Sequence, residues 1–256
     1  MKSVSARMFS LRESIKASLG VAAAMSLVCA TSLPAWAVPF STNLIVNGDA
    51  ESGAASAGGF DVISPIPGWA PIGNFTVVAY GAPGGFPLLS DPGPASRGSN
   101  FFAGGPSNAL SSASQSIDVS SSQSAIDAGA VSFSLEGFLG GFDGQGDNAV
   151  LTATFLDGTS FSLGTAFIGP VSNVDRGSLT GLLFRSMNGT LPIGTRNIDL
   201  DLTMTRLAGS YNDGYADNLS LILSGPSTNP VPEPGTVLLL GSGLAGLAAW
   251  RRRKIA

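Results

Sequence analysis

The fold of this chain is decided by the stretch NAVLTATFL-DG-TSFSLGTA, residues 148–166. In its first run, apolar residues alternate with threonines: Leu151, Ala153 and Phe155 against Thr152 and Thr154. Alternation with a period of two is typical of a strand that buries one face. The pair Asp157-Gly158 between two such runs is the strongest short-range signal for a β-hairpin. The stretch therefore predicts antiparallel strands over residues 148–156 and 159–166, joined by a tight turn.

The same alternation recurs through most of the chain between residues 38 and 224. Apolar side chains alternate with Ser, Glu, Asp or Thr over residues 131–136, 198–205 and 219–223. Shorter strand-like segments occur at residues 43–46, 75–80, 100–103, 113–119 and 182–187, separated by clusters of Gly, Pro, Asn, Asp and Ser. No segment has a convincing amphipathic-helix pattern. About nine strands predict one all-β domain over residues 38–224, an antiparallel jelly-roll-like β-sandwich.

Charge is distributed unevenly along the 256 residues. The net charge is −4, but residues 38–230 contain five arginines, no lysine and fifteen of the seventeen acids, a net charge of −10. Such a body repels phosphate backbones, so we expect no nucleic acid among its partners. The chain has no histidine, and its one cysteine is Cys29. These absences exclude a histidine base, a His-ligated metal and, in the body, thiolate sites and disulfides.

The first 37 residues have the three parts of a secretory signal peptide. Basic residues up to Lys16 precede an apolar run from Leu19 to Ala30, and Ala35-Trp36-Ala37 matches an A-x-A cleavage site. The apolar run is too short for a comfortable membrane span. We therefore expect cleavage after Ala37 and export of the chain that begins at Val38.

A second tripartite pattern follows a short linker at residues 225–230. Pro232-Glu233-Pro234 precedes an apolar run at residues 236–250, and Arg251, Arg252 and Arg253 follow it. The run predicts a transmembrane segment, with the basic cluster in the cytoplasm and the body outside. Residues 231–254 resemble the PEP-CTERM sorting signal of Gram-negative bacteria. The resemblance implies processing by an exosortase near the PEP triplet, in a host that makes exopolysaccharide. The alternative is an ordinary C-terminal anchor.

The two ends of the body carry another resemblance. NLIVNGDAE (residues 43–51) opens the body and YNDGYADNLSL (residues 211–221) closes it. Both resemble the corresponding strands of the galactose-binding-like sandwich, the fold of many carbohydrate-binding modules, in which the two strands pair. The resemblance also implies a structural calcium ion, held by Glu51 and Asp217, with Asp49 beside them and backbone carbonyls. The alternative is that these acids cap turns.

A second calcium candidate is the glycine-rich segment GGFDGQGDN, residues 140–148. The spacing of Asp143, Gln145 and Asp147 is similar to the start of a calcium-binding loop, but no glutamate closes it. The alternative is an exposed turn.

Sugar-binding sites use an aromatic platform and a few hydrogen-bonding side chains. The candidates for such a site are Trp69, Tyr80, Arg97, Arg206, Tyr211 and Tyr215. Trp69 is the only tryptophan of the predicted body, and its alternative role is to fill the core or its rim. Each arginine has the alternative role of pairing with a neighbouring Asp.

The sequence contains no convincing catalytic pattern. It has no G-x-S-x-G elbow, and no His or Lys in the body to activate a hydroxyl. We therefore expect a non-enzymatic protein, exported through an inner-membrane-anchored intermediate to the cell surface or extracellular matrix. Calcium would stabilise it, and exopolysaccharide would be its ligand. Two alternatives stay open: a glycan-active hydrolase that uses paired carboxylates, and a purely structural biofilm protein.

Overall fold

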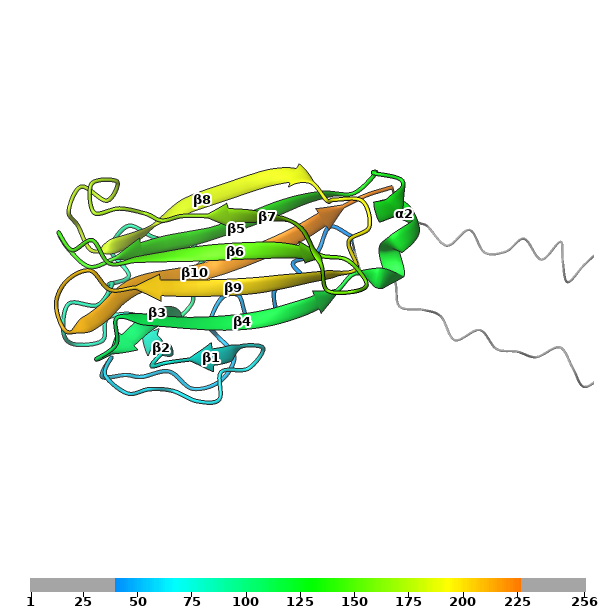
Figure 1. Ribbon diagram of the computed structural model, residues 1–256. Helices are drawn as coiled ribbons and strands as arrows, with labels where there is room; N and C mark the ends of the chain where they lie inside the picture. The colour runs from blue at the N-terminus through cyan, green and yellow to red at the C-terminus, as the bar shows by residue number, and fades with distance from the viewer. Residues whose placement is uncertain (1–39, 227–256) are drawn as a thin grey trace, which may run out of the picture. The chain divides into compact units, whose positions relative to one another are not determined.

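The computed structural model describes residues 40–226, which form two antiparallel sheets packed face to face (Figure 1). The predicted signal peptide, residues 1–37, and the predicted sorting signal, residues 231–254, lie outside the described residues. Within residues 40–226, no helix is long and apolar enough to cross a membrane.

Each sheet has five strands and is named here by its central strand. The β9 sheet has the spatial order β1 (Ala70–Ile72), β4 (Leu110–Asp118), β9 (Asn197–Thr205), β6 (Asn148–Leu156) and β7 (Ser162–Ile168). The β10 sheet has the order β2 (Thr76–Ala79), β3 (Asn100–Pro106), β10 (Tyr211–Ser224), β5 (Ser132–Gly141) and β8 (Gly181–Thr190). The predicted fold class, an antiparallel jelly-roll-like sandwich, is confirmed.

The main core lies between the two sheets. The inward-facing residues of β9 are Ile198, Leu200, Leu202 and Met204, and all four are fully buried. They pack in one cluster with the inward-facing residues of β5 and β10: Phe133, Leu135, Leu139, Leu219, Leu221 and Leu223. Burial therefore follows the period of two that the sequence predicts, and the polar residues of β9 face outward.

The predicted hairpin is confirmed, but its turn is longer than two residues. Strands β6 and β7 pair from Leu151↔Ile168 to Leu156↔Ser162, with a register shift at the last step. The Asp157 carboxylate accepts hydrogen bonds from the backbone N–H of Thr159 (2.8 Å) and of Phe161 (3.0 Å). The residue with positive φ is Ser160, at 65°. Asp157 thus organises a longer turn through its side chain, which a dipeptide signal does not reveal.

Two further expectations about secondary structure are wrong. Residues 43–46 form no strand and have only an isolated bridge, Asn43↔Ile222. Strand β1 and the short helices η1 (Ser120–Ser122) and α2 (Gln123–Asp127) were not expected from the sequence. The helices follow β4 in a serine-rich segment whose polar pattern gives no helical period.

The opening segment nevertheless lies beside the closing strand, as the resemblance implies. Backbone N–H groups of Ser41 and Leu44 donate to the carbonyls of Leu223 and Leu221, each at 2.8 Å. Gly48 accepts from the N–H of Leu219 at 2.8 Å, and a Cβ at Gly48 would lie only 2.2 Å from the Leu219 oxygen. Only glycine permits this approach. The pairing brings both ends of the described chain to one end of the sandwich (Figure 1).

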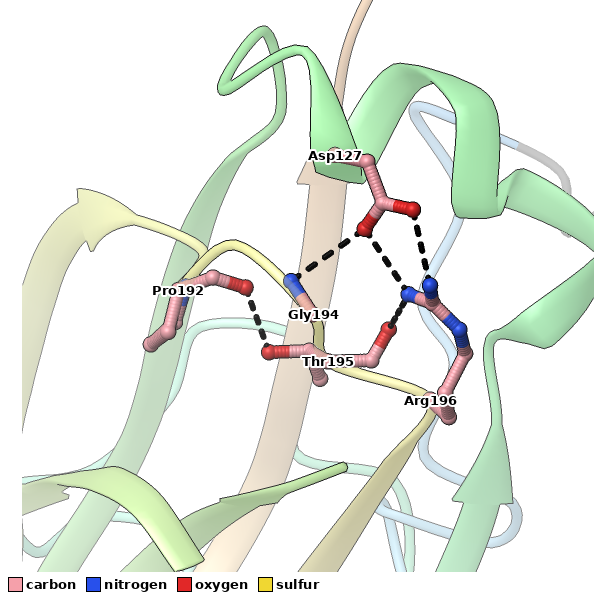
Figure 2. Close-up of polar contacts among 5 residues, drawn as sticks. All are labelled: Asp127, Pro192, Gly194, Thr195 and Arg196. Carbon is pink, nitrogen blue, oxygen red and sulfur yellow. Dashed lines mark hydrogen bonds and ion pairs between the residues drawn. The ribbon is translucent and has the colours of Figure 1, made fainter. Parts of the chain in front are cut away.

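Helix α2 is fastened to the turn that precedes β9. Figure 2 shows the Asp127 carboxylate between the guanidinium of Arg196 (2.7 Å) and the backbone N–H of Gly194 (3.2 Å). The hydrogen bond from Arg196 lowers the pKa of Asp127. The Thr195 hydroxyl donates to the Pro192 carbonyl within the same turn. Because the ion pair is solvent-accessible, it orients the helix more than it stabilises the fold.

The outer faces of the two sheets differ. A segment that we name the strap, residues 80–99, lies over part of the outer face of the β10 sheet. Beneath it is a second apolar cluster: Val78, Ala82, Phe86, Phe101, Ala103, Leu182, Tyr211 and Tyr215. On the β9 sheet, by contrast, the outward side chains of β4, β6 and β9 remain solvent-accessible.

Replacing Leu200 by Ala would leave a cavity at the centre of the main core. Leu200 is 0% exposed, and such changes lower the free energy of unfolding by about 2–5 kcal/mol. We expect a correspondingly lower midpoint of urea unfolding, with Thr203→Ala on the outer face of the same strand as control. Equal midpoints for L200A and T203A would contradict the assignment of this core.

Candidate functional site

The outward face of β10 alternates tyrosine and aspartate: Tyr211, Asp213, Tyr215 and Asp217. The strap covers these residues through Phe86, whose ring centroid lies 5.1 Å from that of Tyr211 and 6.2 Å from that of Tyr215. Tyr215 is 0% exposed. Tyr211 and Tyr215 therefore pack in a core, and the structure corrects the prediction that they bind ligand.

The aspartates between these tyrosines are buried with them. The Tyr215 hydroxyl donates to Asp213 at 2.6 Å. Burial, together with the nearby carboxylate of Asp147, raises the pKa of Asp213 to about 6, although the hydrogen bond from Tyr215 lowers it. Burial also raises the pKa of Tyr215. This pair thus keeps its protons to a higher pH than exposed groups would.

Two residues predicted to hold calcium, Glu51 and Asp217, and two predicted to bind ligand, Tyr80 and Arg97, meet where the strap begins and ends. The Tyr80 hydroxyl donates to Asp217 at 2.7 Å. The Arg97 guanidinium lies 5.4 Å from the Tyr80 ring centroid. Glu51 accepts from the backbone N–H groups of Ser99 and Asn100, each at 2.8 Å. These contacts fasten both ends of the strap to the opening segment and to β10.

Within residues 40–226, Arg97 makes no ion pair. Its guanidinium donates to three carbonyls of the strap itself: Pro94 (2.9 Å), Leu88 (3.1 Å) and Asp91 (3.0 Å). All of these bonds are local, so Arg97 shapes the strap and has little capacity left for a ligand.

The Asp217 carboxylate accepts hydrogen bonds from the Tyr80 hydroxyl and from the backbone N–H of Asn218, both at 2.7 Å. Burial, and to a smaller extent the nearby carboxylates of Glu51 and Asp49, raise the pKa of Asp217 to about 8, although the hydrogen bonds that it accepts lower it. A polar hollow of about 320 Å³ lies beside it, lined by Asn43, Asn47, Asp49, Asn218 and Ser220 among others. No three His, Cys, Asp or Glu side chains of residues 40–226 form a group that could hold a metal. A calcium ion here would therefore need backbone or amide oxygens as well as carboxylates.

The second calcium candidate is occupied by protein donors. Asp147 is 0% exposed, and its carboxylate accepts from the N–H groups of Leu207, Ala208 and Asp213. The guanidinium of Arg176 donates to the carbonyls of Asp143 and Gln145, both at 3.0 Å. A cation in the loop would have to displace this arginine, so the geometry favours the alternative, a turn closed by hydrogen bonds within the protein.

The last two predicted ligand residues have structural partners. Trp69 is 6% exposed, its indole N–H donates to the Asn47 carbonyl at 3.1 Å, and its ring packs against Phe102. Arg206 donates to the Ser210 carbonyl at 2.8 Å within the loop between β9 and β10. Trp69 therefore has the alternative role, core packing, and Arg206 closes a loop.

The outer face of the β9 sheet forms a groove that the sequence analysis missed. It has a volume of about 450 Å³ and is lined by Ala70, Ser114, Gln115, Ser116, Thr154, Asp199, Leu200 and Asp201. Asp201 lies in register between Ser114 of β4 and Thr152 of β6. The Ser116 hydroxyl donates to Asp199 at 2.6 Å, and partial burial raises the pKa of Asp201. The sequence does show the polar residues that alternate with apolar ones in each of these strands. They can be recognised as one surface only when the order of the strands in the sheet is known.

The end of the chain carries sequence evidence of another kind. Pro232-Glu233-Pro234, the apolar run and the arginine cluster follow the described residues in the order already given. The chain carries a PEP-CTERM protein-sorting motif. The match covers residues 230–254.

The PEP-CTERM motif identifies an exported protein that is anchored transiently in the membrane. It covers only the tail, so it does not describe the sandwich. The signal peptide that export requires stays a prediction.

Solved structures similar to this chain belong to several kinds of protein. A family 16 carbohydrate-binding module has 18% identity, with 70% of this chain and 99% of that chain covered and a TM-score of 0.40. A Stig cyclase from Fischerella sp. TAU has 13% identity, 74% and 100% coverage and a TM-score of 0.44. The enzymatically active domain of bacteriophage CBA120 tailspike protein 4 has 15% identity, 72% and 21% coverage and a TM-score of 0.39. The chain thus spans about a fifth of that tailspike chain. No curated protein sequence matches this chain.

Asp213→Asn tests the buried tyrosine–aspartate pair. The folded pKa of about 6 exceeds the ordinary value of 3.8, so Asp213 stabilises the fold below pH 4 and this contribution is lost as the pH rises to 6. The full shift in the pKa of Asp213 corresponds to a change of at most about 3 kcal/mol in the free energy of unfolding. We expect the parent to lose stability relative to D213N between pH 4 and pH 6, as measured by urea unfolding.

Asp175→Asn is the matched control. A backbone hydrogen bond from Ser172 lowers the pKa of Asp175. The stability of the parent relative to D175N should therefore rise with pH, the opposite of the change expected for D213N. A pH-independent difference between the parent and D213N would contradict the burial of this carboxylate.

Proposed function

We propose that this chain is a non-catalytic, polysaccharide-binding protein that an exosortase sorts to the cell surface or extracellular matrix. The PEP-CTERM motif supports the sorting step. The observation that supports binding is the open outer face of the β9 sheet, on which hydroxyl and carboxylate groups form one continuous surface.

The chemistry of this face suits a polyhydroxylated chain. One row across the sheet, given by the strand register, is Ala70, Ser114, Asp201, Thr152 and Phe167. With strands spaced by about 4.8 Å, the row is roughly 19 Å long. Its serine and threonine hydroxyls both donate and accept hydrogen bonds, and Asp201 accepts them. Phe167 at one rim is 55% exposed and Ile72 at the other is 68% exposed. They offer apolar surface for the C–H faces of sugar rings.

Substitution of Asp201 tests this surface. In the full chain, Asp201→Ala removes a charged acceptor, and such hydrogen bonds contribute about 1.5–3 kcal/mol, or roughly a tenfold loss of affinity or more. We expect that loss for the host's own exopolysaccharide, measured by isothermal titration calorimetry. Ser186→Ala, an exposed hydroxyl on the other sheet, is the control. Equal affinities for D201A and S186A would contradict the proposed surface.

A glycan hydrolase is the second candidate, because Asp199 and Asp201 lie two residues apart on one strand. Their Cα atoms are therefore about 7 Å apart and their side chains leave the same face of the sheet, which allows the carboxylates to adopt the separation used by inverting glycosidases, about 6.5–9.5 Å. The raised pKa of Asp201 would suit a general acid. Release of reducing ends from the host polysaccharide, abolished in D201N, would establish this function in place of the non-catalytic one.

We further propose that a structural calcium ion binds beside Asp217 and Glu51. The support is the buried Asp217 carboxylate, with Glu51 and Asp49 close enough to raise its pKa. Saturating calcium at a hundred times its dissociation constant would add about 2.7 kcal/mol to the stability of the fold. We expect EDTA to lower the melting temperature of the parent and of Asp175→Asn, but not of Asp217→Asn. An unchanged melting temperature of the parent in EDTA would contradict the calcium proposal.

A further inference from the structure

Three of the four sheet edges within residues 40–226 are closed to further pairing. Strand β1 has three residues and includes Pro71. On β2, Ser56 pairs with the outer side of the strand through Val77 and Ala79. Strand β7 has a register shift and Gly164 at φ 154°. Short strands, proline and bulges are the usual devices that stop an edge from pairing with another chain.

The fourth edge, β8, has no proline, bulge or shortening, and its only glycine with positive φ is its first residue, Gly181 at 155°. All ten of its residues, GLLFRSMNGT, pair with β5 in one unbroken register. It contains no proline, lysine or acid, and it forms the upper rim of the sandwich in Figure 1. Phe184 is 49% exposed and Met187 is 39% exposed. Such an edge presents unpaired backbone groups beside apolar side chains.

The backbone groups that face this free edge can be identified. The N–H of Leu182 donates away from β5, to the Pro92 carbonyl at 2.8 Å. Backbone groups alternate along an antiparallel strand. The N–H and C=O groups of Phe184, Ser186, Asn188 and Thr190 therefore also point away from β5.

We propose that β8 pairs antiparallel with β8 of a second copy of this chain, about a two-fold axis at Ser186. This register places Ser186 opposite itself and Phe184 opposite Asn188 of the second copy. It covers residues 184–188, because the N–H of Leu182 is already bonded to the Pro92 carbonyl, and it joins the two β10 sheets into one sheet of ten strands.

The charge on β8 favours this register. Arg185 is the only charged residue of the strand, and its guanidinium already contacts Asp175 at 3.3 Å and the Phe184 carbonyl at 3.1 Å. An axis at Arg185 would oppose two like charges directly, which is destabilising. The axis at Ser186 instead places Arg185 opposite Met187 of the second copy. The Phe184 carbonyl keeps a second lone pair for the new bond.

The pairing determines how two copies are oriented. Both ends of the described chain lie at one end of the sandwich (Figure 1), and antiparallel β8 strands reverse the long axis of the second copy. The described C-terminal residues of the two copies therefore lie at opposite ends of the dimer.

Ser186→Pro tests the pairing without breaking the β5–β8 ladder, because the N–H that proline removes faces the free edge. Ser186→Ala keeps this N–H and is the matched control. We expect sedimentation equilibrium of the full chain in detergent to show a monomer–dimer equilibrium for the parent and S186A, and at least tenfold weaker association for S186P. The melting temperature of S186P must be close to that of the parent, to show that the variant folds. If it is lower, Asn188→Pro, on the same edge, serves as a second variant. A monomeric parent, or equal association of the parent and the proline variants, would overturn the proposal.

Cross-linking tests the register and the orientation. Hydrogen-bonded cross-strand pairs have Cα atoms about 5.5 Å apart, within reach of a disulfide. In a Cys29→Ser background, Ser186→Cys should give a disulfide-linked dimer and Thr190→Cys should not. A dimer cross-linked equally by both cysteines would contradict the antiparallel arrangement.

Discussion

The alternation along β9 is the constraint on which the rest of the molecule depends. Its inward residues, from Ile198 to Met204, hold the two sheets together, and its outward residues, Asp199 and Asp201, occupy the centre of the exposed groove. A shift of one residue in register would exchange the two sets. The nine residues of β9 therefore contribute to both the core and the proposed binding face.

The two sheets treat their outer faces in opposite ways. On the β10 sheet, a tyrosine–aspartate alternation is buried beneath the strap, and its carboxylates are satisfied by tyrosine hydroxyls and backbone N–H groups. On the β9 sheet, the outward hydroxyls and carboxylates stay in contact with solvent. The proposed binding surface thus lies on the β9 sheet, which the strap does not cover. The free edge belongs to the β10 sheet, which the strap partly covers.

Local patterns predicted most of the strands from the sequence, because period-two burial needs only neighbouring residues. The bounds of β6 were predicted as residues 148–156, and the same segment forms the strand. Residues 43–46 were not predicted correctly, because a close approach at Gly48 and side-chain bonds from Asn43 replace a regular ladder there.

The candidate site was harder to predict, because it depends on contacts between distant segments. Tyr211 and Tyr215 have the pattern of exposed residues, and the covering ring of Phe86 is more than a hundred positions away. The guanidinium of Arg176 donates to the Asp143 carbonyl from 33 positions away, and no local pattern predicts this contact either. The groove joins hydroxyls of β4, β6 and β9, whose adjacency no local pattern contains. The sorting motif, by contrast, is continuous in sequence and was recognised from it.

The central claim is that the open face of the β9 sheet binds the polysaccharide of the host. Amide hydrogen exchange of the full chain, with and without that polysaccharide, tests it most directly, because protection reports local opening along each strand. The account predicts slower exchange in β4, β6 and β9 when the polysaccharide is present, and no change in the strap. Protection confined to the strap, or no change in these three strands at saturating polysaccharide, would contradict it.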